Sequence, residues 1–430
     1  MKIPPSNKNQ FNKDTLTLEK LPTNTLSHLN RVQRWANFIA GYSIEFVDEC
    51  LKNSNPKTDI VLDPFSGCGT TILAARNRHL KAFAFERHDL FHCLSKIKSQ
   101  NFSIDELNIV KNTITSSRKS IEWSQDSIKF LSKMYTEPEL RELAKFSMGI
   151  SLLPERLTSL GVAFFLAVCE KTCGAQTDGI YKAPTTLKNK TPIPVAIESA
   201  YRFFLDDISS EWYQNIISKA PNATIYHHSS EDMSAIEDST IKYFITSPPY
   251  LNNFDYCEMT RMQLYLLGWT SSWKDISTKI RNKLITNTTT ALKGKKELTY
   301  QNAQRDSLPK KLNTELNFIV QQLDIERKNR AGKKEYNFLV FPYYAQIQNV
   351  LKEIHRTAQK GAEIHWVVAD AALYGIHIET HIHTKIIMQE LGFQNVKIHF
   401  MRKRGHRWIL DKRDGSEKGL GEYHITAQRT

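Results

Sequence analysis

Two short runs near the N-terminus restrict the kind of sheet that this chain can form. Residues 59–62 (DIVL) are an apolar strand that ends in Asp63-Pro64, the glycine turn FSGCGTT follows, and ILAARNRHL then has helical spacing. A second strand, KAFAFE, begins after Leu80, and HDLFHCLSKIKS has the pattern of a second helix. Strands joined by a crossover helix run parallel in one sheet. We therefore predict an α/β fold with a doubly wound, Rossmann-like sheet.

The same alternation returns in the second half of the chain. Further strands are expected at 223–228 (ATIYHH), 241–246 (IKYFIT) and 362–370 (AEIHWVVAD), and in the closing runs QNVKIHFMRK and EYHITAQ. The stretch between the second predicted strand and the strand at 223–228 is rich in apolar helical patterns. It contains one polar loop, CGAQTDGIYKAPTTLKNKTPIP. The predicted organisation is an N-terminal extension (1–34), a core (35–100, 221–270 and 335–430), a helical insertion (101–220) and a basic insertion (271–334).

The positive charge of the chain is concentrated in the basic insertion. Lys plus Arg outnumber Asp plus Glu by 58 to 45 overall, and residues 271–334 alone contain 15 basic against 6 acidic side chains. Such a local excess suits a polyanionic partner, because Lys and Arg neutralise phosphates while Asn, Gln and Thr can contact base edges. The alternative is a disordered, solvated loop.

Cysteine usage and the N-terminus exclude several classes of protein. The six cysteines are scattered, without a CxxC pair or histidines at metal-ligand spacing, so neither a disulfide framework nor a metal site is expected. The first residues are polar, and no window approaches the roughly 20 apolar residues of a membrane span. We expect a soluble, cytoplasmic protein with no membrane partner.

The glycine turn has features of a nucleoside site. Gly67 and Gly69 let the backbone approach a ligand at the carboxyl end of the first strand, where open α/β sheets bind nucleotides. The full GxGxxG and the GK[ST] step are both absent, which disfavours dinucleotide and triphosphate cradles. Glu86, at the end of the second strand, is placed to accept hydrogen bonds from a ribose diol. The alternative is an exposed carboxylate at a strand end.

A second unusual feature is the run YFITSPPYLNNFDY, residues 243 to 256. Proline cannot donate to a sheet ladder and fixes its own φ, so Pro248 and Pro249 must end the strand in a rigid corner. Asn252, Asn253, Asp255 and Tyr256 follow this corner, and are either ligand-contacting or ordinary loop residues.

Together, DPFSGCGTT and Ser247-Pro248-Pro249-Tyr250 resemble motif I and the catalytic motif IV of the S-adenosylmethionine-dependent amino-methyltransferases of DNA. WANFIAGYSIEFVDECL (35–51) resembles their motif X, and the stretch after Tyr343 resembles their later motifs. The resemblance implies a Rossmann-like methyltransferase sheet and S-adenosylmethionine as cofactor. The implied cofactor-binding residues are Phe38, Gly41, Asp63, Pro64, Phe65, Ser66, Gly67, Gly69, Thr70, Thr71, Glu86, Ser229 and Asp232.

Within that set, the resemblance implies particular roles. Asp63, Phe65, Gly67 and Gly69 would line the methionine part of the cofactor, and Glu86 would hold its ribose. Many relatives have an acidic residue soon after the third strand, where this chain has His228-Ser229 followed by Glu231 and Asp232. Which of these meets the adenine ring stays open.

The resemblance also implies the chemistry of Ser247, Pro248, Pro249 and Tyr250. The Ser247 hydroxyl and a carbonyl such as that of Pro248 would accept hydrogen bonds from an exocyclic base amine and stabilise its developing positive charge. Tyr250 would stack on a base extruded from the duplex. No Pro-Cys pair occurs in the chain, so covalent cysteine catalysis at a ring carbon is unsupported.

The expected function is methylation of double-stranded DNA at a specific site. A Ser at the first motif IV position is more common in the family among cytosine-N4 enzymes, so cytosine N4 is preferred, with adenine N6 as the alternative. A companion restriction enzyme is an implied partner, and the insertions would recognise the DNA sequence. Less favoured alternatives are an RNA methyltransferase and an inactive DNA-binding protein. Asp370 is expected to support the fold only. The histidines of GIHIETHIH could suggest a metal, but a solvated or packing role is preferred for them.

Overall fold

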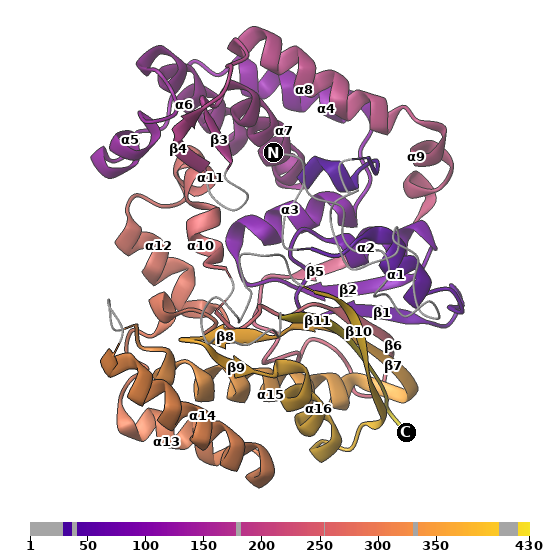
Figure 1. Cartoon of the computed structure of the whole chain (residues 1–430). Helices are drawn as coiled ribbons and strands as arrows, with labels where there is room; N and C mark the ends of the chain where they lie inside the picture. The colour runs from indigo at the N-terminus through magenta and orange to yellow at the C-terminus, as the bar shows by residue number, and fades with distance from the viewer. Residues whose placement is uncertain (1–28, 37–40, 178–181, 253, 330–333, 404–419) are drawn as a thin grey trace.

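The computed structural model describes residues 29–36, 41–177, 182–252, 254–329, 334–403 and 420–430. Its centre is a seven-stranded sheet in the order β10-β11-β7-β6-β1-β2-β5 (Figure 1). The strands are β1 (Ile60–Asp63), β2 (Lys81–Phe85), β5 (Thr224–Tyr226), β6 (Ile241–Thr246), β7 (Ala358–Ala369), β10 (Gln394–Lys403) and β11 (Gly421–Gln428). The five strands from β7 to β5 pair in parallel, and β11 is antiparallel to both β7 and β10. The predicted doubly wound α/β sheet is confirmed.

Helices cover both faces of this sheet. On one face lie α1 (Ile44–Cys50) and α2 (Thr70–Asn77), with α3 (Asp89–Ser99) beside α2; on the other lie α15 (Val340–Thr357) and α16 (Thr380–Glu390) (Figure 1). Alternation along β1 explains this arrangement. Val61 packs with Phe46 and Ile72 on the α1 and α2 side, whereas Leu62 packs with the buried side chains of α15.

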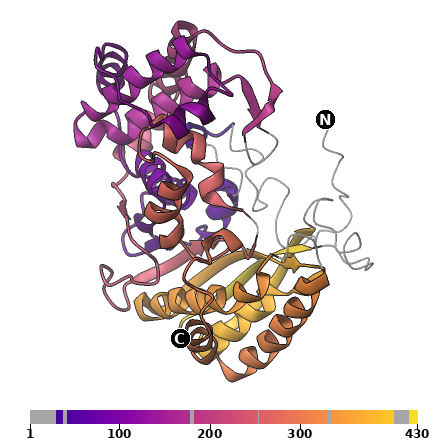
Figure 2. The same ribbon diagram turned by 90° about the vertical axis from the view of Figure 1, so that its left-hand side faces the viewer.

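The residues predicted as a helical insertion form a separate layer beyond α3 (Figures 1 and 2). They contain α4 (Ile104–Thr115), α5 (Gln125–Leu131), α6 (Glu137–Ser151), α7 (Glu155–Thr172), α8 (Ile193–Ile208), α9 (Glu211–Asn215) and η4 (Ile217–Lys219). The prediction of a single polar loop between α7 and α8 was wrong. Two short antiparallel strands, β3 (Ala175–Thr177) and β4 (Lys182–Leu187), occur there, because backbone pairing does not require an apolar pattern.

The described part of the basic insertion is largely helical. After α10 (Tyr256–Met259) and α11 (Arg261–Leu266), it contains α12 (Trp273–Lys279), η5 (Arg281–Lys283), η6 (Thr289–Ala291), α13 (Leu298–Asp306) and α14 (Lys310–Asn329), and η7 (Tyr336–Phe338) then leads to α15. In α14, Leu312, Leu316 and Leu323 are fully buried, and they belong to the same apolar cluster as the α15 face of the sheet. The described residues of this insertion are therefore anchored on the core.

Two further features complete the fold. A small antiparallel sheet of β8 (Ala371–Leu373) and β9 (Ile376–Ile378) follows β7, and η3 (Gln33–Ala36) precedes α1. Asp207 of α8 holds η3 in place, because its buried carboxylate accepts hydrogen bonds from the Val32 N–H (2.9 Å) and the Arg34 guanidinium (2.6 Å). No helix in the described part of the chain combines the length and apolar composition that crossing a bilayer requires.

Candidate active site

The glycine turn and the proline corner leave the sheet at the same edge. β1 and β6 are parallel neighbours, with Leu62 opposite Phe244, so the segments that follow them emerge side by side. A cavity lies between these segments. Its wall includes Gly41, Tyr42, Pro64, Phe65, Ser66, Gly67, Thr70, Glu86, Ser229, Ser247 and Pro249. One cavity therefore contains residues from both motifs that the sequence singled out.

Asp63 joins the ends of the two strands from below the cavity. Its carboxylate is almost fully buried and accepts hydrogen bonds from the Thr246 hydroxyl (2.6 Å), the Phe65 N–H (3.0 Å) and the Tyr42 hydroxyl (3.1 Å). Burial raises the pKa of this carboxyl, and the hydrogen bonds oppose that rise. Asp63 does not line the cavity; in the structure it fixes the position of the residues that do.

The two glycines of the turn have different surroundings. Both have positive φ, +52° at Gly67 and +81° at Gly69. A Cβ at Gly69 would lie 3.2 Å from the Cα of Ser95, so this position, which precedes α2, is closed by packing. A Cβ at Gly67 would meet nothing within 4 Å, and Gly67 lines the cavity. The open space beside Gly67 is therefore available to a ligand.

Glu86 connects the end of β2 to the glycine turn. One carboxylate oxygen accepts a hydrogen bond from the Gly67 N–H and the other accepts from the His88 N–H, each at 2.8 Å. Burial raises the pKa of Glu86 to about 7, although both backbone hydrogen bonds lower it. A carboxylate at the cavity wall, held by two backbone donors, is a fixed acceptor for hydroxyl groups of a ligand.

The proline corner is fixed from two directions. The Tyr343 hydroxyl, from α15, donates a hydrogen bond to the Pro249 carbonyl at 3.0 Å. The Ser247 hydroxyl donates to the Tyr250 hydroxyl (3.2 Å), which in turn donates to the buried carboxylate of Glu422 (3.0 Å) on β11. The Ser247 hydroxyl uses its proton in the bond to Tyr250. The lone pairs of the Ser247 oxygen can therefore accept a further hydrogen bond.

The structure separates the predicted site residues into groups. Gly41, Pro64, Phe65, Ser66, Gly67, Thr70, Glu86, Ser229, Ser247 and Pro249 line the cavity, whereas Asp63, Gly69, Thr71, Asp232, Pro248 and Tyr250 do not. Thr71 is buried below the cavity, where its hydroxyl meets that of Tyr42. Asp232 is exposed and accepts a hydrogen bond from the Ser234 N–H. Phe38 and Asn253 lie outside the described residues.

The residues after the corner have separate positions. Tyr256 lines the cavity. Asp255 caps α10 and forms a 3.1 Å ion pair with the buried Arg281 of the basic insertion. Asn252 has φ +50° and donates its N–H to the Asn287 carbonyl. Tyr256 is therefore the one of these three described residues that is placed to meet a ligand in the cavity.

Several lining residues were missed by sequence reasoning. Gln33, Tyr42, His88 and Phe91 flank the predicted motifs, and Lys283 and Ile285 come from the basic insertion. Tyr42 directly follows Gly41, which was predicted to bind the cofactor. The sequence could therefore have indicated Tyr42 as a lining residue. Nothing local marks Lys283, because its approach to the cavity depends on the folding of a remote insertion. Its presence shows that the basic insertion borders the cavity.

The histidines of GIHIETHIH make internal contacts. His377 and His381 lie 2.9 and 2.6 Å from the two carboxylate oxygens of the buried Asp370, and these contacts lower the pKa of Asp370. His383 is fully buried between the Tyr344 hydroxyl (2.6 Å) and the Glu315 carboxylate (3.0 Å). All three therefore stabilise the region after β7.

The chain is similar in sequence to known DNA methyltransferases. The family model described as DNA methylase, of the N6/N4 type, matches residues 1–97. The Type II methyltransferase M.BsoBI of Geobacillus stearothermophilus is 21% identical over 443 residues, covering 93% of this chain and 84% of the relative. The Type II methyltransferase M.AvaI of a Nostoc species is 22% identical over 398 residues, covering 85% of this chain and 80% of the relative.

Proposed function

The chain belongs to the amino-methyltransferases of DNA, and on that premise we propose that it transfers a methyl group from S-adenosylmethionine to the exocyclic N4 of a cytosine extruded from double-stranded DNA. The observation that carries the proposal is the single cavity lined by both Gly67 and Ser247. A methyl donor beside the glycine turn and a base amine beside the proline corner would then be neighbours.

The cavity residues fit S-adenosylmethionine. The open space beside Gly67 admits a ligand close to the backbone, and Thr70 lies at the start of α2, where the helix dipole favours a carboxylate such as that of the methionine part. Glu86 would accept hydrogen bonds from the ribose hydroxyls. Phe65, Phe85, Phe91 and Ile285 give apolar surface on which the adenine ring would pack. Ser229 also lines the cavity, and we assign it to the adenine ring.

When bound, the cofactor supplies a methyl group made electrophilic by a positively charged sulfur. The work of the chain is to prepare the nucleophile, because the lone pair of a base amine is delocalised into its ring. The Ser247 oxygen would accept a hydrogen bond from that amine and so favour a localised lone pair and the positive charge that develops during attack. Glu422, acting through Tyr250, orients Ser247 for this role.

The choice of cytosine N4 over adenine N6 rests on Ser247 at the first motif position, where the family's adenine enzymes more often have Asp or Asn. Lys283 and the other exposed lysines of the basic insertion would hold the phosphates beside the cavity. Because the named relatives are Type II methyltransferases, we also propose that the chain works beside a restriction enzyme that recognises the same site.

Methyl transfer can be tested directly with labelled cofactor and unmethylated duplex DNA. Digestion to nucleosides and mass spectrometry should find the label in N4-methylcytosine. Ser247→Ala should lower kcat by about 10²- to 10³-fold, the usual effect of losing one group that stabilises transition-state charge, with little change in cofactor affinity. Ser209→Ala is the matched control, because Ser209 is exposed on the distant helical layer.

The outcomes separate the alternatives. Label in N6-methyladenine would replace the cytosine assignment with the adenine one. Tight, salt-dependent DNA binding without cofactor binding would instead indicate an inactive DNA-binding protein, and label in RNA alone would contradict the DNA substrate.

A further inference from the structure

Three histidines lie in a row on one face of the sheet, away from the proposed active site. His365 is on β7, His424 on β11 and His399 on β10. His424 is the register partner of both Val367 and His399, and His365 is two residues from Val367 on the same strand. Because side chains alternate along a strand, all three imidazoles project from the same face. That face is the one covered by α1.

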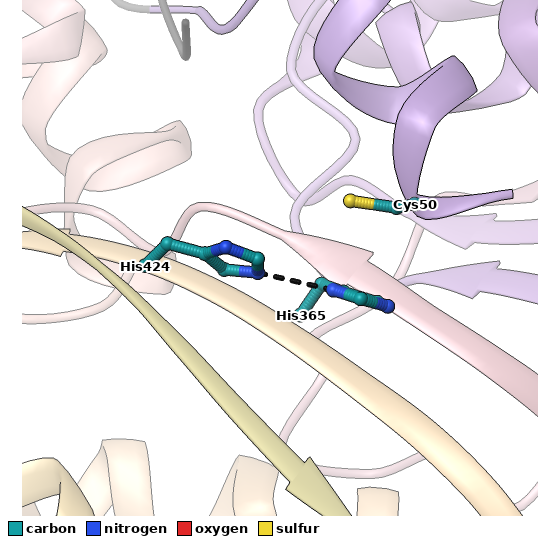
Figure 3. A group of neighbouring side chains, drawn as sticks. All are labelled: Cys50, His365 and His424. Atoms are coloured by element: carbon teal, nitrogen blue, oxygen red, sulfur yellow. Dashed lines mark hydrogen bonds between the residues drawn. The ribbon is translucent and has the colours of Figure 1, made fainter. Parts of the chain in front are cut away.

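The last residue of α1, Cys50, approaches this row from above (Figure 3). One potential ligand atom from each of Cys50, His365 and His424 lies within 4.8 Å of the other two. The Nδ1 of His365 and the Nε2 of His424 are only 3.0 Å apart. For these two nitrogens to share a hydrogen bond, one of them must hold a proton, and a metal ion can take the place of that proton.

A second observation also points to a ligand at this cluster. The Nε2 of His365 is buried and has no hydrogen-bond partner among the described residues, which is costly for a polar atom. It lies 3.9 Å from a carboxylate oxygen of Glu363. If Nδ1 coordinated a metal, Nε2 would have to carry the ring proton, and a carboxylate is the usual acceptor for that proton in metal sites. Metal binding would therefore give this buried atom a defined role.

The donor atoms of the cluster suit metal binding. Cys50, His365 and His424 together offer one thiol sulfur and two imidazole nitrogens, which are donors that divalent transition metals prefer. Burial, together with the nearby Glu49, raises the pKa of the Cys50 thiol. A bound cation would reverse this effect by stabilising the thiolate.

We propose that Cys50, His365 and His424 form a binding site for a divalent transition-metal ion, with Zn²⁺ the best match to two imidazoles and one thiolate. The fourth position would be taken by water or by His399, whose ring lies beside that of His424. A surface hollow lined by Glu49, Lys52, Asn53 and Met401 gives access from solvent.

The position of the site indicates a structural role. His365 is four residues before the end of β7, about 13 Å from the strand end that leads toward the proposed active site. None of the three ligands lines the active-site cavity. The ion would instead attach α1 to β7 and β11. Because Gly41 and Tyr42 lie just before α1 and do line the cavity, this attachment would also stabilise one wall of it.

Chelator-treated full-length protein, titrated with Co²⁺ and with Zn²⁺, tests the proposal. We expect one Co²⁺ per chain, with the intense thiolate charge-transfer band and the visible bands of a tetrahedral site, displaced by Zn²⁺. Zn²⁺ should also raise the thermal unfolding midpoint. Cys50→Ser should remove the charge-transfer band and the thermal shift. Cys93→Ser and His355→Gln, which alter residues outside the cluster, should retain both effects.

Cys50 lies at a helix end and is only partly buried, so its replacement is expected to leave the protein folded, as circular dichroism would verify. The proposal would be overturned if no Co²⁺ bound the wild-type protein, or if the charge-transfer band and the Zn²⁺-induced shift persisted in Cys50→Ser. Since the ligands lie outside the active-site cavity, a negative result for metal binding would not contradict the proposed methyl transfer.

Discussion

The hydroxyl of Thr246 donates a 2.6 Å hydrogen bond to the buried carboxylate of Asp63. Thr246 is the last residue of the strand before the proline corner, and Asp63 is the last residue of the strand before the glycine turn. This bond therefore connects the two halves of the proposed active site across neighbouring strands. The Tyr42 hydroxyl, which donates to the same carboxylate, adds the segment before α1 to the junction.

Thr246→Val should destabilise the protein in a pH-dependent way. The substitution removes one donor from a buried carboxylate, so the folded-state pKa of Asp63, already raised, should rise further. When the pKa of a carboxyl is higher in the folded than in the unfolded state, the associated stability is present below the unfolded-state pKa. That stability is lost as pH rises through the folded-state pKa. The free energy of unfolding should thus fall by about 1.5–3 kcal/mol at alkaline pH, and by less in acid. Urea unfolding at several pH values measures this difference; a difference that grows toward acid pH would contradict the prediction.

Cofactor affinity should depend on the ionisation of Glu86. Its pKa of about 7 means that the carboxylate, the better acceptor for ribose hydroxyls, predominates only above neutral pH. Calorimetry should therefore show tighter S-adenosylmethionine binding at pH 8 than at pH 6. Glu86→Gln should weaken binding by about 10- to 100-fold at pH 8, the effect of losing a charged hydrogen bond, and should flatten the pH dependence.

An S-adenosylhomocysteine analogue without ribose hydroxyls provides the control for Glu86. If the carboxylate binds the diol, the wild type and Glu86→Gln should bind this analogue almost equally. A Glu86→Gln penalty of the same size with and without the hydroxyls would assign Glu86 to the turn alone, through its bond to the Gly67 N–H.

Glu422 should act on catalysis through Tyr250 and Ser247. Glu422→Gln keeps the side-chain shape but removes the charge that receives the Tyr250 hydrogen bond. We expect kcat to fall about tenfold, with the KM values for DNA and cofactor nearly unchanged. The reason is that the substitution disturbs the orientation of Ser247, which prepares the base amine for attack, and not the binding of either substrate. Tyr250→Phe should cause a loss in kcat as well, and the double variant should lose less than the sum of the two in free energy. Additive effects would indicate that the two residues act separately.

Lys283 should contribute to DNA affinity without contributing to sequence choice. It is exposed at the mouth of the cavity, where a phosphate beside the extruded base would lie. Lys283→Gln should weaken binding to any duplex and reduce the slope of log affinity against log salt by about 0.9. Lys57→Gln is the control, since Lys57 is exposed before β1, at the opposite end of that strand. Equal effects of both variants would exclude a specific role for Lys283.

The sequence predicted the parts of this site that depend on local pattern. Apolar runs ending in Asp63-Pro64 and in Ser247-Pro248 identified β1 and β6, and the observed β6 has the predicted bounds. Their placement at a common edge followed from the rule that parallel strands end together. The structure also assigns Asp63, Gly69 and Thr71 to positions behind the cavity wall, a distinction that motif matching could not make.

Features that depend on register or on remote packing were not predicted. His365, His399 and His424 are dispersed in the sequence, and only the pairing of β7, β11 and β10 brings them to one face. Because these histidines are far apart in the sequence, the sequence pattern did not predict a metal site. The approach of Lys283 to the cavity similarly depends on Arg281, whose ion pair with Asp255 attaches the basic insertion to the segment after the proline corner.

The stereochemistry of transfer tests most directly whether the methyl group passes straight from the glycine turn to the proline corner. S-adenosylmethionine with a chiral methyl group, made from hydrogen, deuterium and tritium, would be used with duplex DNA, and the configuration of the methyl group in the product nucleoside determined. A donor and an amine that share one cavity require a single in-line transfer, so we expect inversion. Retention would require an intermediate methyl carrier and would exclude direct transfer.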